Sequence, residues 1–531
     1  MAPPADACII GAGASGATAA KVLGEAGLRV LVLERGPWLK PESFLSDELG
    51  TINREFLRPD PALDPRTLRT SANEDAQTAS FCPVPQMVGG GTVHWTGWVP
   101  RFTSDDFRQR SLHGDVADAN LADWPVSYTD IEPYYDAVEW GLGVSGLAGA
   151  NRFEGVRTRG YPCPPLTPAP YTKRFQSGCD ALGLNWFPTP TALRSQPFGG
   201  RPAAVLHPFL ERHGDPTGTK STVLTTFIPD AIATGRVEIR PESYVRELLR
   251  DSTGRIRGAV YLDSEGRPHE QRAEIFLLAC GAIETARLWH LSRLPDSNDM
   301  VGRNLTLHEY SGAIGLFDEP VFGWKGGGHI GASTFEFYGS DPSRGFVGGG
   351  HVVCSGARLP WPINHTLPGR PLWGAAMKKA DRDTFNHTMA VGGLIGDLPQ
   401  HTNRVDLDPS VRDALNVPVA RITHAAHPND YAQSRFLVDR CADILEAAGA
   451  RQVWRFPMER ITGNASHQHG TTRMGDDPAT SVLDRNCRAH EVPNLYVVDG
   501  GSFPTPAGNN PTLTIMANAW RVASAIAAGP S

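Results

Sequence analysis

The sequence predicts an α/β protein, in which a parallel sheet with crossover helices is joined to a second domain built mainly on an antiparallel sheet with helices. Two observations support this fold class. Near the N-terminus, apolar strands at residues 7–10 and 29–33 enclose a helix of small residues, which is a βαβ pattern. Within residues 311–425, strand-like segments follow one another with loops between them, which is typical of an antiparallel sheet.

The turn after the first strand carries three spaced glycines. Gly11 permits a tight turn, Gly13 lets the backbone approach a pyrophosphate, and Gly16 lets the helix pack on the strand. Glu34 ends the second strand 23 residues after Gly11, close to where an acid that binds ribose is expected. An ordinary strand-to-helix turn is the alternative, but the agreement of all four elements favours a Rossmann-like dinucleotide site. Its expected contacts are Gly11, Gly13, Ala14, Ser15, Gly16, Glu34 and Arg35.

Composition excludes several classes of function. The 531 residues suffice for two or more domains with buried cores. A net charge of −7 offers no basic stripe for nucleic acid, and no run of about 18 apolar residues indicates a membrane span. Few residues precede the first strand, so we expect no signal peptide. Eight cysteines without Cys-x-x-Cys spacing argue against a zinc site or a disulfide framework, so we expect no metal and a reduced, cytoplasmic protein.

Two segments between the regular elements are candidates for ligand contact. Residues 37–85 are proline-rich and are expected to wrap the surface or cover a cofactor. Residues 88–98 place three glycines before hydroxyl, imidazole and indole groups, a backbone that can approach a flat ligand closely. A glycine hinge beside a core tryptophan is the alternative for this second segment.

The middle of the chain alternates connections with regular elements. Residues 123–140 predict a helix with aromatic core residues and a capping box from Thr129 to Glu132. Residues 146–198 are rich in proline and glycine, as in a lid, a substrate loop or a domain link. The remaining elements expected before residue 290 are a helix at 219–233, strands at 237–240, 244–249, 257–262 and 273–279, and a turn entering a helix at 281–288.

The second half begins with strands expected at residues 346–354, 388–395 and 419–424. Two Gly-Gly-Gly-His runs, at 326–329 and 348–351, open no helix of small residues and are therefore interpreted as loop or bulge positions. A helix at 430–448 with one apolar face is expected to stop at Gly449.

Two places near the C-terminus contain groups suited to catalysis. His467 and His469 flank a glutamine before a glycine turn, where an imidazole at a loop tip could take a proton, although structural hydrogen bonds are an equal alternative. A buried strand ends at Asp499 and Gly500, the position where open α/β sheets bind ligands. Asn510 is expected to cap a helix that begins at Pro511, whose positive end favours a developing anion.

These motifs together resemble the glucose-methanol-choline (GMC) oxidoreductases, flavoenzymes that oxidise alcohols with FAD. The resemblance covers the whole chain in order. It rests on the N-terminal fingerprint, the Gly-Gly-Gly-Thr segment, residues 279–288 and 301–305, His467-x-x-Gly-Thr and Asn510-Pro-x-x-Thr. It implies an FAD-binding domain at 1–310, with wrapping and lid segments at 37–85 and 146–198, a substrate-binding domain at 311–460, and a return to the FAD-binding domain at 461–531.

The resemblance also assigns roles to residues. His467 would be the catalytic base and Asn510 its partner, and together they would hold the substrate hydroxyl while a hydride moves to flavin N5. Glu34 would bind the adenosine ribose, and Val245 would contact adenine through its backbone. The further FAD contacts that it implies are Gly90, Gly91, Thr92, His94, Trp95, Thr96, Ala279, Gly281, Asp499, Gly500, Pro511 and Thr512.

Within the family, residues 92–96 are most similar to a Thr-His-Trp-Thr segment of pyranose oxidases, whose histidine carries FAD covalently. Val93 interrupts the match, so covalent and noncovalent FAD at His94 both stay open. The resemblance implies oxidation of a sugar or sugar-like alcohol, with oxygen or another carrier as electron acceptor. Oxidation of an amino-sugar hydroxyl in an aminoglycoside, a non-redox flavin lyase and an NAD-dependent dehydrogenase are the alternatives.

Overall fold

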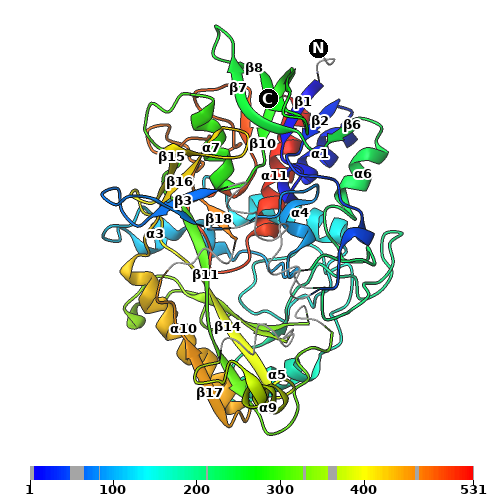
Figure 1. Ribbon diagram of the computed structural model, residues 1–531, viewed down its shortest axis with the longest axis vertical. Coiled ribbons are helices and arrows are strands. Elements are labelled where there is room, and N and C mark those ends of the chain that lie inside the picture. Colours follow the sequence, from blue (N-terminus) through cyan, green and yellow to red (C-terminus); the bar gives the residue numbers. More distant parts are fainter. Residues whose placement is uncertain are drawn as a thin grey trace.

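The computed structural model describes residues 5–47, 65–79, 81–82, 84–210, 213–326, 330–356, 367–460 and 466–529. Two regions follow one another along the long axis (Figure 1). The parallel sheet and both termini lie at one end, and a long antiparallel sheet with its covering helix lies at the other. The chain passes between them repeatedly, so segments far apart in sequence meet where the two regions join.

Five parallel strands form the first sheet, in the order β19-β10-β1-β2-β6. Every neighbouring pair is parallel, as crossover connections require. Their runs of Val, Ile and Leu are buried because helices cover the sheet. The strands are β1 (Ala5–Ile10), β2 (Val30–Leu33), β6 (Val237–Arg240), β10 (Ala273–Leu278) and β19 (Leu495–Val497).

Helix α1 (Ala14–Glu25) lies at the centre of the helices around this sheet. Its small residues let it pack closely against α11 (Thr512–Ala528) and α6 (Phe227–Ala233). Helix α4 (Tyr128–Leu142) packs on the other side of α11. The N-terminal βαβ unit predicted from the sequence is therefore confirmed, and its helix is covered by the last helix of the chain.

Two smaller sheets border the parallel one. A three-stranded antiparallel sheet, β7-β8-β9, precedes helix α7 (Ala282–Leu291). A four-stranded sheet has the order β15-β16-β3-β4. The strands are β3 (Arg66–Arg69), β4 (Gln77–Ala79), β7 (Tyr244–Arg250), β8 (Ile256–Leu262), β9 (Pro268–Gln271), β15 (Arg404–Arg412) and β16 (Pro418–Thr423).

The antiparallel sheet of the second region has the order β17-β11-β14-β13-β12-β5, with β18 paired to the end of β11. Helix α10 (Pro428–Ala447) packs along it, and α5 (Pro170–Ala181) packs on α10. Leu437, Cys441 and Leu445 carry the apolar face of α10 into this core. The strands are β5 (Phe187–Pro188), β11 (Thr306–Leu316), β12 (Ala332–Thr334), β13 (Gly350–Ser355), β14 (Thr388–Gly396), β17 (Gln452–Phe456) and β18 (Gln468–His469).

The capping box of α4 was predicted two residues too late. Ser127 is the cap, and its hydroxyl accepts a hydrogen bond from the Asp130 amide while the Asp130 carboxylate accepts one from the Ser127 amide. Thr129 lies inside the helix. Glu132 instead accepts hydrogen bonds from buried Arg101 at 3.2 Å and from the Thr158 amide at 2.9 Å. The aromatic residues of α4 belong to the core, as predicted.

Three further predictions need correction. The helix expected at 219–233 covers only 227–233, because Thr225 and Thr226 donate hydrogen bonds to the backbone carbonyls of Lys220 and Thr222 and hold a turn there. Residues 146–198 contain α5, which the proline-rich composition concealed. The strand expected at 419–424 joins β3 in parallel and β15 in antiparallel pairing rather than the long sheet.

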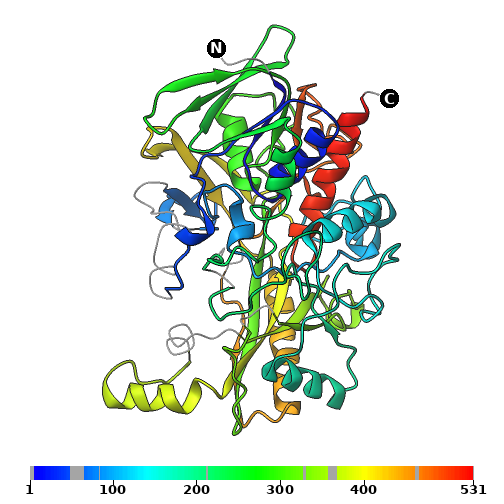
Figure 2. The same ribbon diagram turned by 90° about the vertical axis from the view of Figure 1, so that its right-hand side faces the viewer.

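Some of the predicted segments fall outside the described residues, and a helix of the structure was not predicted. Residues 48–64, inside the predicted wrapping segment, and residues 327–329 of the first Gly-Gly-Gly-His run fall outside the described residues. Gly348 has φ +83° and precedes β13, as predicted for a loop, but Gly350 and His351 of the second run belong to β13, so the prediction of loop or bulge positions is wrong for them. Helix α9 (Gly374–Thr384) was not predicted, and it stands out from the body (Figure 2). Among the described residues, no helix is both long and apolar enough to cross a membrane.

Candidate active site

A cavity of about 980 Å³ lies where the two regions meet. Its walls come from the turn after β1, the ends of β2 and β19, the 3₁₀ segment η2 (Gly90–Val93), the first turns of α7 and α11, and strands β11, β13 and β14. All the site residues predicted from the sequence line this cavity except Gly16 and His469. On these walls are Gly11, Gly13, Ala14, Ser15, Glu34, Arg35, Gly90, Gly91, Thr92, His94, Trp95, Thr96, Val245, Ala279, Gly281, His467, Asp499, Gly500, Asn510, Pro511 and Thr512.

The glycines of the fingerprint differ in the space around them. Gly11 has φ +105°, and a Cβ there would lie 2.5 Å from the Ala279 carbonyl oxygen. A Cβ on Gly16 would lie 1.9 Å from the Gly11 carbonyl oxygen, so this glycine is needed for the turn itself. At Gly13 the nearest atom would be the Gly90 Cα, 4.0 Å away, and Gly13 faces the cavity. Gly13 therefore leaves room for a ligand, whereas Gly11 and Gly16 serve packing.

Glu34 holds the turns at the end of the cavity beside β1 and β2. One carboxylate oxygen accepts a hydrogen bond from the Ala12 amide at 2.8 Å, and the other accepts from the Gly36 amide at 2.9 Å. Burial raises the pKa of Glu34, and these amide hydrogen bonds oppose the rise. Each oxygen keeps a lone pair for a further donor, so a ribose contact is compatible with this structural role.

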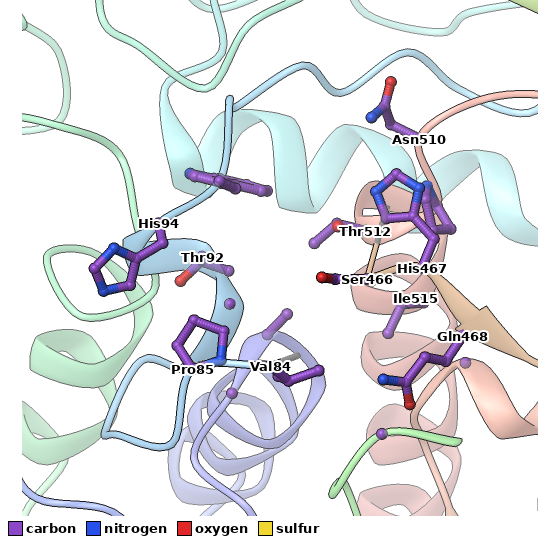
Figure 3. A pocket seen from close by; sticks show the side chains of 18 of the residues that line it. Val84, Pro85, Thr92, His94, Ser466, His467, Gln468, Asn510, Thr512 and Ile515 are labelled. Carbon is purple, nitrogen blue, oxygen red and sulfur yellow. The ribbon is translucent and has the colours of Figure 1, made fainter. Parts of the chain in front are cut away.

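The η2 segment forms the facing wall. The Thr92 hydroxyl donates to the Gly89 carbonyl at 2.7 Å and accepts from the Val223 amide at 3.1 Å. The buried Lys220 ammonium donates to the Trp95 carbonyl at 2.6 Å, which holds the chain that follows His94. Figure 3 shows His94 and Thr92 on the side of the cavity opposite His467. The His94 ring meets Phe44 edge-on, with 5.9 Å between ring centroids.

His467 lies on the same side of the cavity as Asn510 (Figure 3). Its Nδ1 atom is 3.0 Å from Nδ1 of His308 on β11. Burial lowers the pKa of His467 to about 4, so the imidazole is neutral near pH 7 and can accept a proton. The segment after it is fixed because the Gly302 amide donates to the Thr471 carbonyl at 2.7 Å.

The predicted helix cap at Asn510 is wrong. Helix α11 begins at Thr512, Pro511 precedes it in helical backbone conformation, and no side chain caps this end. The Asn510 side chain instead contacts buried His351, whose pKa burial lowers to about 3 and Asn510 partly restores. His351 in turn is 2.7 Å from the Ser333 hydroxyl. The side chain of Asn510 is thus held by His351 of the antiparallel sheet, while its backbone leads into α11.

His469 does not lie at a loop tip. It belongs to β18, is fully buried, and stacks on Phe503 with a ring separation of 5.5 Å. Burial lowers its pKa to about 3, and it does not line the cavity. Of the two histidines in this motif, only His467 is placed to meet a ligand.

Asp499 joins the end of β19 to its neighbours. Its carboxylate accepts hydrogen bonds from the Thr285 hydroxyl at 2.5 Å and from the amides of Gly281 at 3.0 Å and Gly501 at 2.9 Å. Burial raises the pKa of Asp499 to about 6 against these hydrogen bonds. The side chain therefore fixes the first turn of α7 at the cavity wall.

Sequence reasoning missed several residues of the site. His308 appeared as one polar residue at the start of a strand, and nothing local linked it to His467. Ser466 has φ +56° immediately before His467, a strained backbone conformation at the cavity wall. Arg66 and Arg287 form ion pairs with Glu284 at 2.8 and 3.2 Å, all at the cavity wall. Arg66 and Glu284 are far apart in the sequence and meet only in the folded chain, whereas Glu284 and Arg287 are neighbours on α7.

Charge is distributed unevenly over the cavity. Within the described chain, the acidic and basic side chains on its wall all come from the parallel-sheet region and its bordering sheet, and the wall from the antiparallel sheet carries none. The charged set is Glu34, Arg35, Arg66, Glu284, Arg287 and Asp499. The uncharged set is Tyr310, Ser311, Gly312, Ala313, Ile314, Val353, Ser355, Ala390, Val391, Gly392 and Phe456.

Comparison with known proteins adds to this geometry. Models of the GMC oxidoreductase family match residues 5–310 and 399–519. The chain belongs to the GMC oxidoreductase family. The resemblance predicted from its motifs is therefore confirmed, and the chain is an FAD-dependent alcohol oxidoreductase.

Relatives in this GMC family act on different alcohols. The chain is 34% identical to 2-methyl-1,2-propanediol dehydrogenase of Mycolicibacterium austroafricanum, over 97% of this chain and 94% of that protein. It is 33% identical to 6'''-hydroxyparomomycin C oxidase of Streptomyces lividus, over 98% and 91% of the two chains. The crystal structure of pyridoxine 4-oxidase from Mesorbium loti matches with a TM-score of 0.64 and 17% identity, over 99% of this chain and all of that one, which shows the shared fold.

The cavity fits the FAD of GMC enzymes. Gly13 borders open space at the start of α1, and a Cβ on Gly91 would meet no atom within 4 Å. These two bare backbones can therefore approach a pyrophosphate and a flat ring. The Trp95 indole nitrogen is buried and finds no hydrogen-bond partner among the described residues, so it is available to a bound cofactor. Apart from Gly16, the FAD contacts predicted from the sequence lie on the wall of this cavity.

Proposed function

We propose that this enzyme oxidises a CH–OH group of a small, uncharged, sugar-like alcohol or polyol, with His467 as the base. The observation that carries the proposal is the position of His467 and Asn510 together at the cavity wall, with His467 held neutral by burial. A neutral imidazole can take the proton of the hydroxyl, and the Asn510 amide can orient the same oxygen.

Other residues of the site support the base and hold the cofactor. Nδ1 of His467 contacts His308, which leaves Nε2 of His467 for the substrate hydroxyl. The N-terminus of α11 lies at the cavity wall and favours negative charge nearby. When bound, FAD supplies the hydride acceptor at flavin N5. Glu34, Val245 and Asp499 are proposed to hold its adenosine end and the turns beside it.

The uncharged wall supports an uncharged substrate. A cationic amino sugar would need carboxylates to offset the loss of water around its ammonium groups. The described wall of the antiparallel sheet offers hydroxyls and apolar groups but no acid. A relative named for hydroxyparomomycin C favours an amino sugar, whereas the relative named for a propanediol agrees with the neutral wall. We therefore place the amino sugar second.

The experiment is an anaerobic screen of the purified enzyme, with flavin absorbance followed near 450 nm. We expect bleaching by neutral diols, polyols or monosaccharides and none by aminoglycosides at equal concentration. Bleaching by aminoglycosides alone would reverse the order of the two substrate classes. No bleaching by any alcohol, together with cleavage of a cyanohydrin, would favour a non-redox lyase. Oxygen uptake with an active substrate then separates an oxidase from an enzyme that uses another carrier.

The mode of FAD attachment at His94 stays open between two alternatives. His94 is buried at the cavity wall, as both a covalent and a noncovalent contact require. Acid precipitation distinguishes them, because a covalent flavin stays with the pellet. Yellow colour entirely in the supernatant would exclude the covalent bond.

Two predictions concern the rest of the chain. No residue of 146–198 lines the cavity, while Arg66, Val84 and Pro85 of the segment 37–85 do. We therefore propose that the segment 37–85 covers the cofactor. The lid role of the segment 146–198 stays a prediction. The eight cysteines are free thiols, in keeping with the cytoplasmic location that we propose.

A further inference from the structure

We propose that His308 is a positioning residue that fixes His467 in the one tautomer able to act as a base towards the cavity. The inference rests on the proposed function, since it takes His467 as the base. It concerns which of the two ring nitrogens of His467 carries the proton before reaction.

Strand register brings the two imidazoles together. β18 pairs with β11 in antiparallel register, with His469 opposite Thr306 and Gln468 opposite Leu307. The next position along this register sets His467 opposite His308. The two Nδ1 atoms are 3.0 Å apart and the rings are perpendicular, with 5.1 Å between centroids. An Nδ1–Nδ1 contact of this length requires one nitrogen to donate and the other to accept.

The second nitrogen of His308 decides which one donates. A Cβ built on Gly396 would lie 2.6 Å from the Ala507 carbonyl oxygen and 3.4 Å from His308 Nε2, so these two atoms share one small space. Nε2 of His308 makes no hydrogen bond of normal geometry among the described residues. The nearby Ala507 backbone raises the pKa of His308, as an acceptor does, although burial lowers this pKa by more. A carbonyl oxygen repels a lone pair and attracts an N–H group, so its proximity favours the tautomer of neutral His308 that carries its proton on Nε2.

The consequence passes to His467. With its proton on Nε2, His308 can only accept at Nδ1, so His467 must donate from its own Nδ1. Nε2 of His467 is then unprotonated and holds the lone pair that takes the hydroxyl proton. The reversed arrangement would place a proton on His467 Nε2 and leave no base at the cavity. Afterwards the cationic His467 keeps its Nδ1–H bond to His308, and no proton moves between the rings.

The titratable groups acting on His308 are His467 and His469, and both lower its pKa. His308 is fully buried, and its ring centroid lies 4.8 Å from that of His469. Burial is the largest of the effects that lower the pKa of His308, so this ring stays neutral with or without His469. A neutral imidazole thus serves where a carboxylate would otherwise orient a catalytic histidine.

The test compares three variants of the holoenzyme. His308→Leu removes the acceptor, and we expect flavin reduction at saturating substrate to slow at least tenfold. The loss should not exceed the roughly 10²–10⁴-fold that a positioned base contributes. The KM for the alcohol should change little, because the substrate contacts remain. His308→Asn places an amide oxygen near the former Nδ1 and should restore most of the rate. His469→Phe removes the neighbouring buried imidazole and should leave the rate close to that of wild type.

A spectroscopic readout makes the test independent of turnover. In protein labelled with ¹⁵N-histidine, two-bond ¹⁵N–¹H correlations should show His467 protonated at Nδ1 and His308 at Nε2. The opposite tautomers would overturn the inference, even if the Leu variant failed to fold. A folded, FAD-loaded His308→Leu enzyme with the wild-type rate would also overturn it, as would an Asn variant as slow as the Leu variant. If His467→Ala retained full flavin reduction, the proposed function itself would fail.

Discussion

Gly13 and Gly16 belong to one fingerprint, yet their replacement by alanine should have opposite effects. Gly13 has φ −80° and ψ −160°, which alanine adopts without strain, and its added Cβ would lie 4.0 Å from the nearest atom. We therefore expect the stability of Gly13→Ala to be unchanged or raised by about 0.4–1 kcal/mol, because the unfolded chain loses freedom.

The cost of Gly13→Ala falls on FAD. The Cβ would enter the space where the pyrophosphate approaches the start of α1 and would displace a charge-assisted hydrogen bond worth about 1.5–3 kcal/mol. The Kd for FAD should then rise roughly 10–100-fold. In Gly16→Ala the Cβ would lie 1.9 Å from the Gly11 carbonyl oxygen, so the turn must shift. We expect this variant to lose about 1–3 kcal/mol or more of folding stability.

The assay measures both quantities for both variants. Chemical denaturation without added FAD gives the free energy of unfolding, and quenching of FAD fluorescence on titration gives the Kd. A Gly13→Ala protein that binds FAD as tightly as wild type would refute the assignment of the pyrophosphate to this turn. A Gly16→Ala protein as stable as wild type would refute the packing argument.

Three further predictions follow from the site and its supports. Ser127→Ala should destabilise the protein by about 0.5–2 kcal/mol through loss of the α4 cap, whereas Thr129→Ala should change stability by less than about 0.5 kcal/mol; thermal melts compare the two. Lys220→Met should leave the Trp95 and Leu210 carbonyls unpaired, lower stability by about 1–3 kcal/mol and loosen FAD, which the ratio of absorbance at 450 to 280 nm detects. Stability should also fall in acid, because the unfolded chain takes up a proton at His467 near pH 6.5 while the folded chain resists until about pH 4. The contribution of His467 is present above pH 6.5, and about 2 kcal/mol of it is lost by pH 5; urea midpoints that do not fall between pH 7.5 and 5 would contradict the burial of a neutral imidazole.

Local sequence patterns predicted the βαβ unit that borders one end of the cavity. The glycine spacing, the apolar strands and Glu34 lie within one βαβ unit, so their geometry depends on neighbours in sequence. The order of the later motifs indicated the family, and the motifs at residues 90–96, 279–281, 467 and 510–512 line one cavity.

Contacts between distant segments could not be predicted in this way. The register of β18 on β11 places His308 opposite His467, and no local pattern specifies a pairing across so many residues. The α4 region contains two possible capping boxes, and buried Arg101 decides between them by taking Glu132 into an ion pair. Asn510 has the residue type of a cap, but its contact with His351 gives it a different role.

The rate of flavin reduction in anaerobic stopped flow, for wild type and His467→Ala with the alcohol that bleaches wild type best, tests the assignment of the base most directly. We predict that the variant binds FAD and folds as wild type does but reduces its flavin about 10²–10⁴-fold more slowly. A His467→Ala enzyme that is reduced at the wild-type rate would contradict the assignment of His467 as the base.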